Sequence, residues 1–191
     1  MNRFYRLAAV FYLVLALGGG LWIGLARGGP IPLRLFLDLQ PAHLALDLAL
    51  GAAAGLLLVG IWRLGRRYLP AARELNDQLA HLLGGMSATD AVALALVSGF
   101  AEELFFRGAV QSAWGWFPAT VLFAALHTGP GRGLKLWTVF ALLAGLLFAG
   151  LVAWSGNLLP AILGHVLVNA INLSELAAGA RVAESESTGD R

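Results

Sequence analysis

Long apolar stretches alternate with short polar segments along the whole chain. A helix needs about 20 apolar residues to cross the hydrocarbon core of a membrane, and most of the stretches are near that length. They cover residues 7–25, 44–62, 88–106, 114–127, 134–154 and 157–177. The pattern therefore predicts about six transmembrane helices.

The segment 70–86 has a different pattern. Its leucines recur at helical spacing while charged and amide side chains fill the opposite face, which is typical of an amphipathic helix at the membrane surface. Gly84 and Gly85 are expected to end this helix, and Ser87 with Asp90 predicts a capping box that starts the next one.

Together these elements predict an all-α, polytopic membrane helix bundle with about six transmembrane helices and one interfacial amphipathic helix. We expect an N-terminal two-helix membrane region with the amphipathic helix over residues 1–86, a core over 87–178, and a disordered polar tail over 179–191.

Composition excludes a soluble protein. Of the 191 residues, 59% are hydrophobic and 13% are charged, and the mean hydropathy is +0.75, whereas a soluble domain carries about 25% charged residues. Because the chain has no cysteine, it has neither a thiolate metal site nor a cysteine nucleophile.

The basic residues predict an orientation in the membrane. The densest basic segment is 63–73, which is expected to be cytoplasmic together with Arg132 and Lys135. Six crossings then place both termini in the cytoplasm of a bacterial cell, with the protein integral to the plasma membrane. Arg27 and Arg34 are then on the outer side of the membrane. The basic residues are not interleaved with stacking aromatics, so the lipid bilayer is the expected partner and nucleic acid is not.

Polar residues within the apolar stretches point to a site. A carboxylate at the centre of a membrane helix costs roughly 2.5–3.5 kcal/mol, yet Glu102 and Glu103 are adjacent. Glu103 lies four residues before Arg107 and can pair with it, whereas Glu102 points about 100° away on the helix and has no local cation. Glu102 is therefore the better candidate for chemistry.

Three further polar residues lie at similar depth on other helices. His165 and Asn169 share a helix face, His127 ends the short fourth stretch, and we expect Asn172 to form only an interhelical hydrogen bond. A rise of about 1.5 Å per residue puts Glu102 about 21 Å, His165 about 18 Å, Asn169 about 12 Å and His127 about 10 Å from the cytoplasmic side.

A carboxylate, two imidazoles and a carboxamide suit the activation of water. One route is a Zn²⁺ ion held by Glu102, His127 and His165, with an open position for water. In the other route Glu102 is the general base, a histidine orients the water, and Asn169 donates to the oxyanion. Ser98, like the other serines in the helices, lacks the sequence context of a nucleophile.

These residues form three ordered motifs: Glu-Glu-x-x-x-Arg at 102–107, Phe-x-x-x-His at 123–127, and His-x-x-x-Asn at 165–169. They resemble the motifs of the CAAX protease and bacteriocin-processing (CPBP, also called Abi) intramembrane proteases, over residues 87–177. The resemblance implies a membrane endopeptidase, a metalloprotease or a glutamate protease, that cleaves a peptide precursor or a membrane protein. It implies a site formed by the residues Glu102, Glu103, His127, His165 and Asn169, with Arg107 in support.

Two other functions stay open at this point. The chain could be a non-enzymatic immunity or regulatory protein on the same scaffold, or a small proton-coupled transporter whose Glu and His residues relay protons. A transporter would more often carry internal repeats and matched broken helices, and the sequence shows neither.

Overall fold

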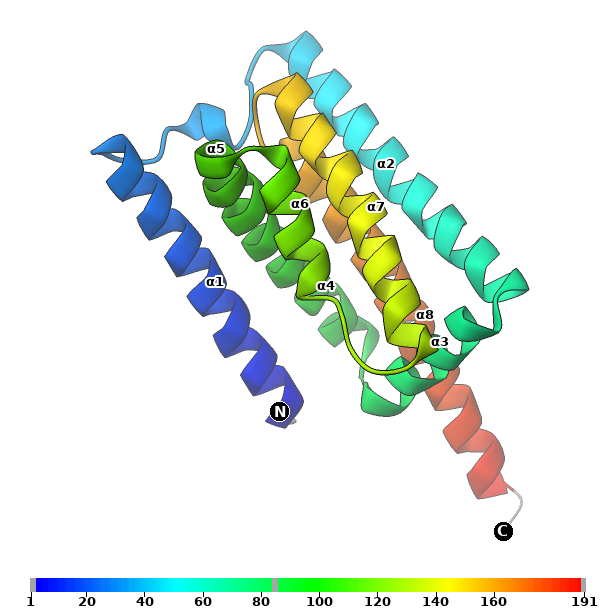
Figure 1. The fold of residues 1–191 in the computed structure, drawn as a ribbon. Coiled ribbons are helices and arrows are strands. Elements are labelled where there is room, and N and C mark those ends of the chain that lie inside the picture. Colours follow the sequence, from blue (N-terminus) through cyan, green and yellow to red (C-terminus); the bar gives the residue numbers. More distant parts are fainter. Residues whose placement is uncertain (1–2, 84–85, 190–191) are drawn as a thin grey trace.

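The structure is a computed structural model that describes residues 3–83 and 86–189, with side chains described for 6–83 and 86–179. Every regular element in these ranges is helical, which confirms the predicted all-α bundle (Figure 1). The elements are α1 (Arg3–Arg27), η1 (Leu33–Leu35), α2 (Pro41–Tyr68), α3 (Pro70–Leu82), α4 (Ala88–Glu103), η2 (Leu104–Val110), α5 (Gln111–Trp114), α6 (Trp116–Ala125), α7 (Arg132–Ser155) and α8 (Leu159–Gly189).

Among the described residues, four helical segments are long and apolar enough to cross a membrane. They are Arg6–Arg27, Pro41–Tyr68, Arg132–Ser155 and Leu159–Gly179, and Trp116–Leu126 is a shorter apolar helix. The third predicted crossing corresponds to α4, which runs without a break into η2 and α5. The apolar helices indicate an integral membrane protein, and six crossings remain a prediction.

The start and end of α4 are set by local chemistry. The predicted capping box is confirmed: the Ser87 side chain accepts from the Asp90 N–H, and the Asp90 carboxylate accepts from the Ser87 N–H. Directly after Glu103 the backbone changes to a π-helix, η2. Such wide turns are frequent at functional sites, and this one follows the two adjacent glutamates.

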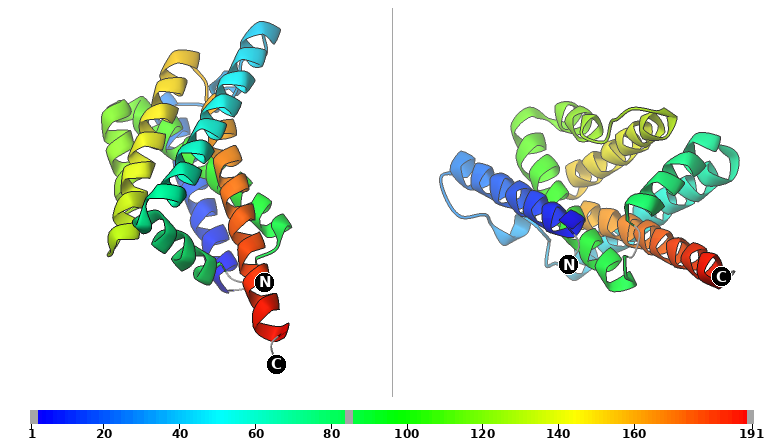
Figure 2. Two further views of the ribbon diagram at one scale, coloured as in Figure 1. Left: turned by 90° about the vertical axis from the view of Figure 1, so that its right-hand side faces the viewer. Right: turned by 90° about the horizontal axis from the view of Figure 1, so that it is seen from below.

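Small residues let α8 approach both α2 and α4, which lie alongside it (Figure 2). A Cβ atom on Gly55 of α2 would lie 2.8 Å from the carbonyl oxygen of Gly164, and one on Gly99 of α4 would lie 2.7 Å from Cγ2 of Val166. Membrane helices commonly pack through such residues, because backbones then come close enough for extensive contact. The helices that carry the glutamates and His165 are thereby brought together.

The amphipathic helix is confirmed as α3, and part of its apolar face packs on the bundle. Ala72 and Leu75 are buried in a cluster with Trp62 of α2, and partly buried residues of α7 pack against it. The opposite end of the helix is not buried in this way, because Leu82 is exposed. This helix therefore covers one end of the bundle in addition to its expected contact with the membrane surface. Gly84 and Gly85, expected to end the helix, lie outside the described residues.

Both ends of the described chain lie at the end of the bundle where α3 lies, and the α1–α2 and α7–α8 connections lie at the other (Figure 1). Gly133 packs on Leu75, so the basic residues around 63–73 and 132–135 share one end, as the orientation requires. The structure continues α8 to Gly189, and the disordered polar tail over 179–191 stays a prediction.

Candidate active site

The two adjacent glutamates of α4 are both buried. Glu103 has no exposed surface and Glu102 is 6% exposed. Their neighbours on the helix, Ala95 and Gly99, are small and buried, which lets α8 lie close to this face. Buried carboxylates need partners or a function, and the two differ in what they contact.

Glu103 is the centre of a buried ion-pair network. Its Oε1 atom accepts from Nη1 of Arg107 at 2.9 Å and lies 2.7 Å from Nδ1 of His165. Arg107 also donates to the Gly145 carbonyl at 3.3 Å and lies over the ring of Phe123, with its guanidinium carbon 4.4 Å from the centroid. The predicted pairing of Glu103 with Arg107 is confirmed, and Glu103 additionally holds His165.

His127 lies in the turn that follows α6, two residues beyond the end of that helix. Its Nδ1 lies 2.7 Å from the carbonyl oxygen of Phe123, and because a carbonyl only accepts, Nδ1 carries the proton. The ring also contacts Phe123 and Trp137, with centroids at 4.5 and 5.4 Å. The histidine thus caps a carbonyl of the last turn, and its Nε2 points away from the backbone.

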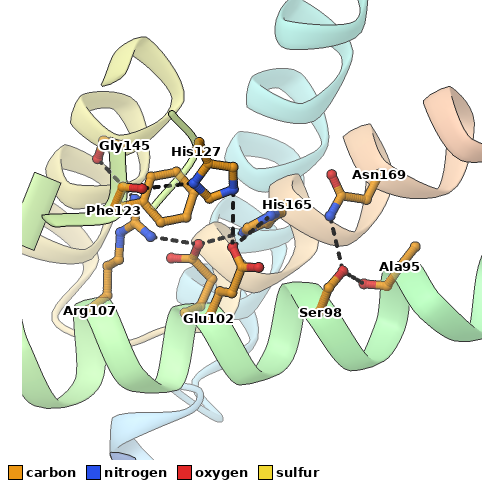
Figure 3. A network of polar contacts seen from close by, with 10 residues as sticks. Ala95, Ser98, Glu102, Arg107, Phe123, His127, Gly145, His165 and Asn169 are labelled. Carbon is orange, nitrogen blue, oxygen red and sulfur yellow. Dashed lines mark hydrogen bonds and ion pairs between the residues drawn. The ribbon is translucent and has the colours of Figure 1, made fainter. Parts of the chain in front are cut away.

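Both histidines present Nε2 to Glu102 (Figure 3). Nε2 of His127 lies 3.9 Å and Nε2 of His165 lies 3.8 Å from Oε2 of Glu102. Since the Glu103 carboxylate is paired with Arg107, His165 donates through Nδ1 and leaves Nε2 as an acceptor. Oε2 is buried and has no hydrogen-bond partner among the described residues. Three acceptors therefore face one another, an arrangement that a water molecule or a cation would satisfy.

The sequence-based depths of these residues differed by about 10 Å, yet their side chains meet. The depth estimate treated each helix as parallel to the membrane normal, whereas the packed helices cross at an angle (Figure 2).

Asn169 lies on the same face of α8 as His165 and in the same cavity. Its Nδ2 donates to the hydroxyl of Ser98 at 3.1 Å, and Ser98 in turn donates to the Ala95 carbonyl at 3.3 Å (Figure 3). One of the two Nδ2 hydrogens is thereby used, and the other stays available.

The expectation for Asn172 is not met. Its Oδ1 is buried without a hydrogen-bond partner in the described part of the chain, and the residue lines the cavity, so it makes no interhelical hydrogen bond through that atom.

The cavity has a volume of about 330 Å³ and is largely apolar away from the glutamate. This volume lies within the range of small-ligand sites, roughly 300–1,000 Å³. Side chains of α3, α7 and α8 form its apolar wall, including Leu75, Leu79, Trp137, Phe140, Leu173 and Leu176. The amphipathic helix therefore contributes to the site, which its surface pattern did not indicate.

Glu102, His127 and His165 are the zinc ligands in one of the two routes that the sequence left open, and their donor types suit that metal. Within the described residues, no group of three or more His, Asp or Glu side chains is placed to hold a metal ion. The Nε2 to Oε2 distances of 3.8 and 3.9 Å exceed the separation of about 3.4 Å between two ligands of a tetrahedral zinc. The arrangement does not fit a bound zinc as it stands, so the steps proposed below use only side chains of the chain.

Two residues of the site were not found from the sequence. Tyr12 of α1 lines the same cavity as Glu102, although nothing in the apolar pattern of residues 7–25 sets it apart. Ser98 was considered only as a nucleophile, and it instead supports Asn169. The feature of the sequence that could have placed Ser98 in the site is its spacing, since Ser98 lies four residues before Glu102 on the same face of α4.

Comparison with known proteins covers the same part of the chain. Residues 84–171 match the family model described as type II CAAX prenyl endopeptidase Rce1-like. An uncharacterized protein of Bacillus subtilis, YpbD, is 38% identical over 80 residues, which are 41% of this chain and 41% of that protein. No solved structure matches the chain.

The matched range includes Glu102, His127, His165 and Asn169 and ends before Asn172. The region 84–171, just under half of the chain, is thus similar to the Rce1-like CAAX prenyl endopeptidases, which are proteases.

Proposed function

We propose that this protein is an intramembrane endopeptidase that hydrolyses a peptide bond of a membrane-associated or precursor peptide. One observation carries the proposal: the buried Oε2 of Glu102, which has no hydrogen-bond partner in the part of the chain that the structure describes, faces Nε2 of His127 and of His165 in a largely apolar cavity. The endopeptidase family of residues 84–171 supports it.

The proposed first step is attack by an activated water molecule. Glu102 takes one proton of the water. An imidazole Nε2 accepts a hydrogen bond from the other hydrogen of the water and so directs the oxygen lone pair. The oxygen bonds to the carbonyl carbon of the scissile peptide, whose oxygen becomes an oxyanion. The second Nδ2 hydrogen of Asn169, which Ser98 does not use, donates to that oxyanion.

In the second step the tetrahedral intermediate collapses. The carbon–nitrogen bond breaks, and Glu102 returns its proton to the leaving amine nitrogen. Glu103 takes no proton in this scheme, because its carboxylate is paired with Arg107. Its part is to hold Nδ1 of His165 so that Nε2 faces Glu102.

The apolar wall supports a substrate segment with apolar side chains. We further propose that the cavity opens toward the cytoplasm of a bacterial cell, because α3 and the basic residues 63–73 lie at that end of the bundle.

The test is to compare protein termini in cells that carry wild type, Glu102→Gln or Glu74→Gln. Glu74 is an exposed glutamate of α3 and serves as the matched control. We expect new termini with wild type and with Glu74→Gln, and none with Glu102→Gln. If wild type and Glu102→Gln give the same termini, the chain is a non-enzymatic membrane protein on this scaffold.

A further inference from the structure

Helix α1 lies outside the family region of residues 84–171, yet it packs directly on the helix that carries the glutamates. A Cβ atom on Gly19 would lie 3.0 Å from the Cα atom of Phe105. Leu15, one turn away, packs against the cluster of Phe106 and Phe123. These contacts fix which face of α1 meets the site.

Tyr12 lies on that face, seven residues or about two turns before Gly19. Its side chain lines the same cavity as Glu102 and Ser98. One side chain of α1 thus faces the cavity that holds both the base proposed above and the serine that binds Asn169.

The single phenolic proton has one favoured acceptor. Ser98 donates its own proton to Ala95 and already accepts from Asn169, whereas a carboxylate is the stronger acceptor. Since Oε2 of Glu102 faces Nε2 of both histidines, the oxygen left for the Tyr12 hydroxyl is Oε1. A hydrogen bond from Tyr12 to Oε1 would fix the rotation of the carboxylate and leave Oε2 turned toward the two histidines.

We propose that Tyr12 is a positioning residue, which holds the Glu102 carboxylate in the rotation in which Oε2 faces His127 and His165. The site is then completed by a helix from outside the family region. The effect of Tyr12 on turnover rests on the proposed function. The effect of Tyr12 on stability rests only on the contacts of its side chain.

The first test uses a peptide that spans a Glu102-dependent cleavage site. We expect Tyr12→Phe to lower kcat about ten- to a hundredfold, because a misplaced catalytic group can cost about that much, and to leave KM within about twofold since the ring stays in the wall. Tyr68→Phe removes a hydroxyl from an exposed tyrosine and should change neither. An unchanged kcat in Tyr12→Phe, or a loss confined to KM, would overturn the proposal.

The second test does not depend on cleavage. The melting temperature in detergent is measured for wild type, Tyr12→Phe, Glu102→Ala and the double variant. We expect Tyr12→Phe to lower the melting temperature of wild type by about 2–4 °C and to have little effect in the Glu102→Ala background. Equal shifts in both backgrounds would overturn the proposal. A coupled pair without Glu102-dependent cleavage would instead contradict only the proposed function.

Discussion

Nδ1 of His165 lies 2.7 Å from Oε1 of Glu103, so the second of two adjacent glutamates holds the histidine that faces the first. The same oxygen accepts from Arg107. Glu102 and Glu103 therefore have different surroundings on one helix, although they are the same residue type at nearly the same depth. The difference leads to separate expectations for their variants.

Glu102→Gln should abolish activity and leave the fold intact, because it removes a base without unpairing a cation. A general base contributes about 10²–10⁴-fold, so cleavage of the substrate peptide should fall by at least about a hundredfold while the melting temperature stays near that of wild type.

Glu103→Gln should mainly destabilise the protein. Arg107 is 1% exposed and would lose its anionic partner, which costs about 3–5 kcal/mol for a buried pair. Chemical or thermal unfolding in detergent measures this loss. A Glu103→Gln protein as stable as wild type would show that the ion pair is not needed for folding.

Chelation should leave activity in place, since the described His and Glu side chains are not placed to hold a metal ion. The measurement is peptide cleavage after treatment with a strong chelator and then with added Zn²⁺. Loss of activity that Zn²⁺ restores, together with loss of zinc binding in Glu102→Gln, would make Glu102 a ligand and contradict its role as a base. Metal content is measured in parallel for His127→Ala.

Gly55→Ala should destabilise the contact between α2 and α8. The added Cβ would lie 2.8 Å from the Gly164 carbonyl oxygen and 3.0 Å from Cβ of Leu167, and overpacking of this kind costs about 1–3 kcal/mol. Gly60→Ala is the control on the same helix, because its Cβ would meet nothing within 4 Å. Equal stability of the two variants would mean that the helices can separate at no cost.

Reporter fusions test the orientation. Fusions after residue 75 and at the C-terminus should both report the cytoplasm, and a fusion between Arg27 and Arg34 should report the outside. The shared end of the basic segments 63–73 and 132–135 supports this arrangement. A cytoplasmic signal from the 27–34 connection would contradict it.

Local sequence patterns predicted most of the elements, since helix periodicity and capping depend on neighbouring residues. The capping box of Ser87 and Asp90, the amphipathic pattern of residues 70–86 and the pairing of Glu103 with Arg107 all appear in the structure. Glu102 also differs from Glu103 as the helical spacing predicted, because among the described residues Arg107 pairs with Glu103 and not with Glu102.

Contacts between distant segments were decided only by tertiary structure. Periodicity gives a face and an approximate depth, but close approach at Gly99 and Gly55 sets how far α8 lies from α4 and α2. That packing turns both Nε2 atoms toward Glu102, and it brings Tyr12 of α1 into the same cavity. The sequence by itself determined which polar residues are available to form the site. The crossing of the helices decided which of them meet, because side-chain contact across a bundle depends on helix rotation and separation, which no single helix encodes.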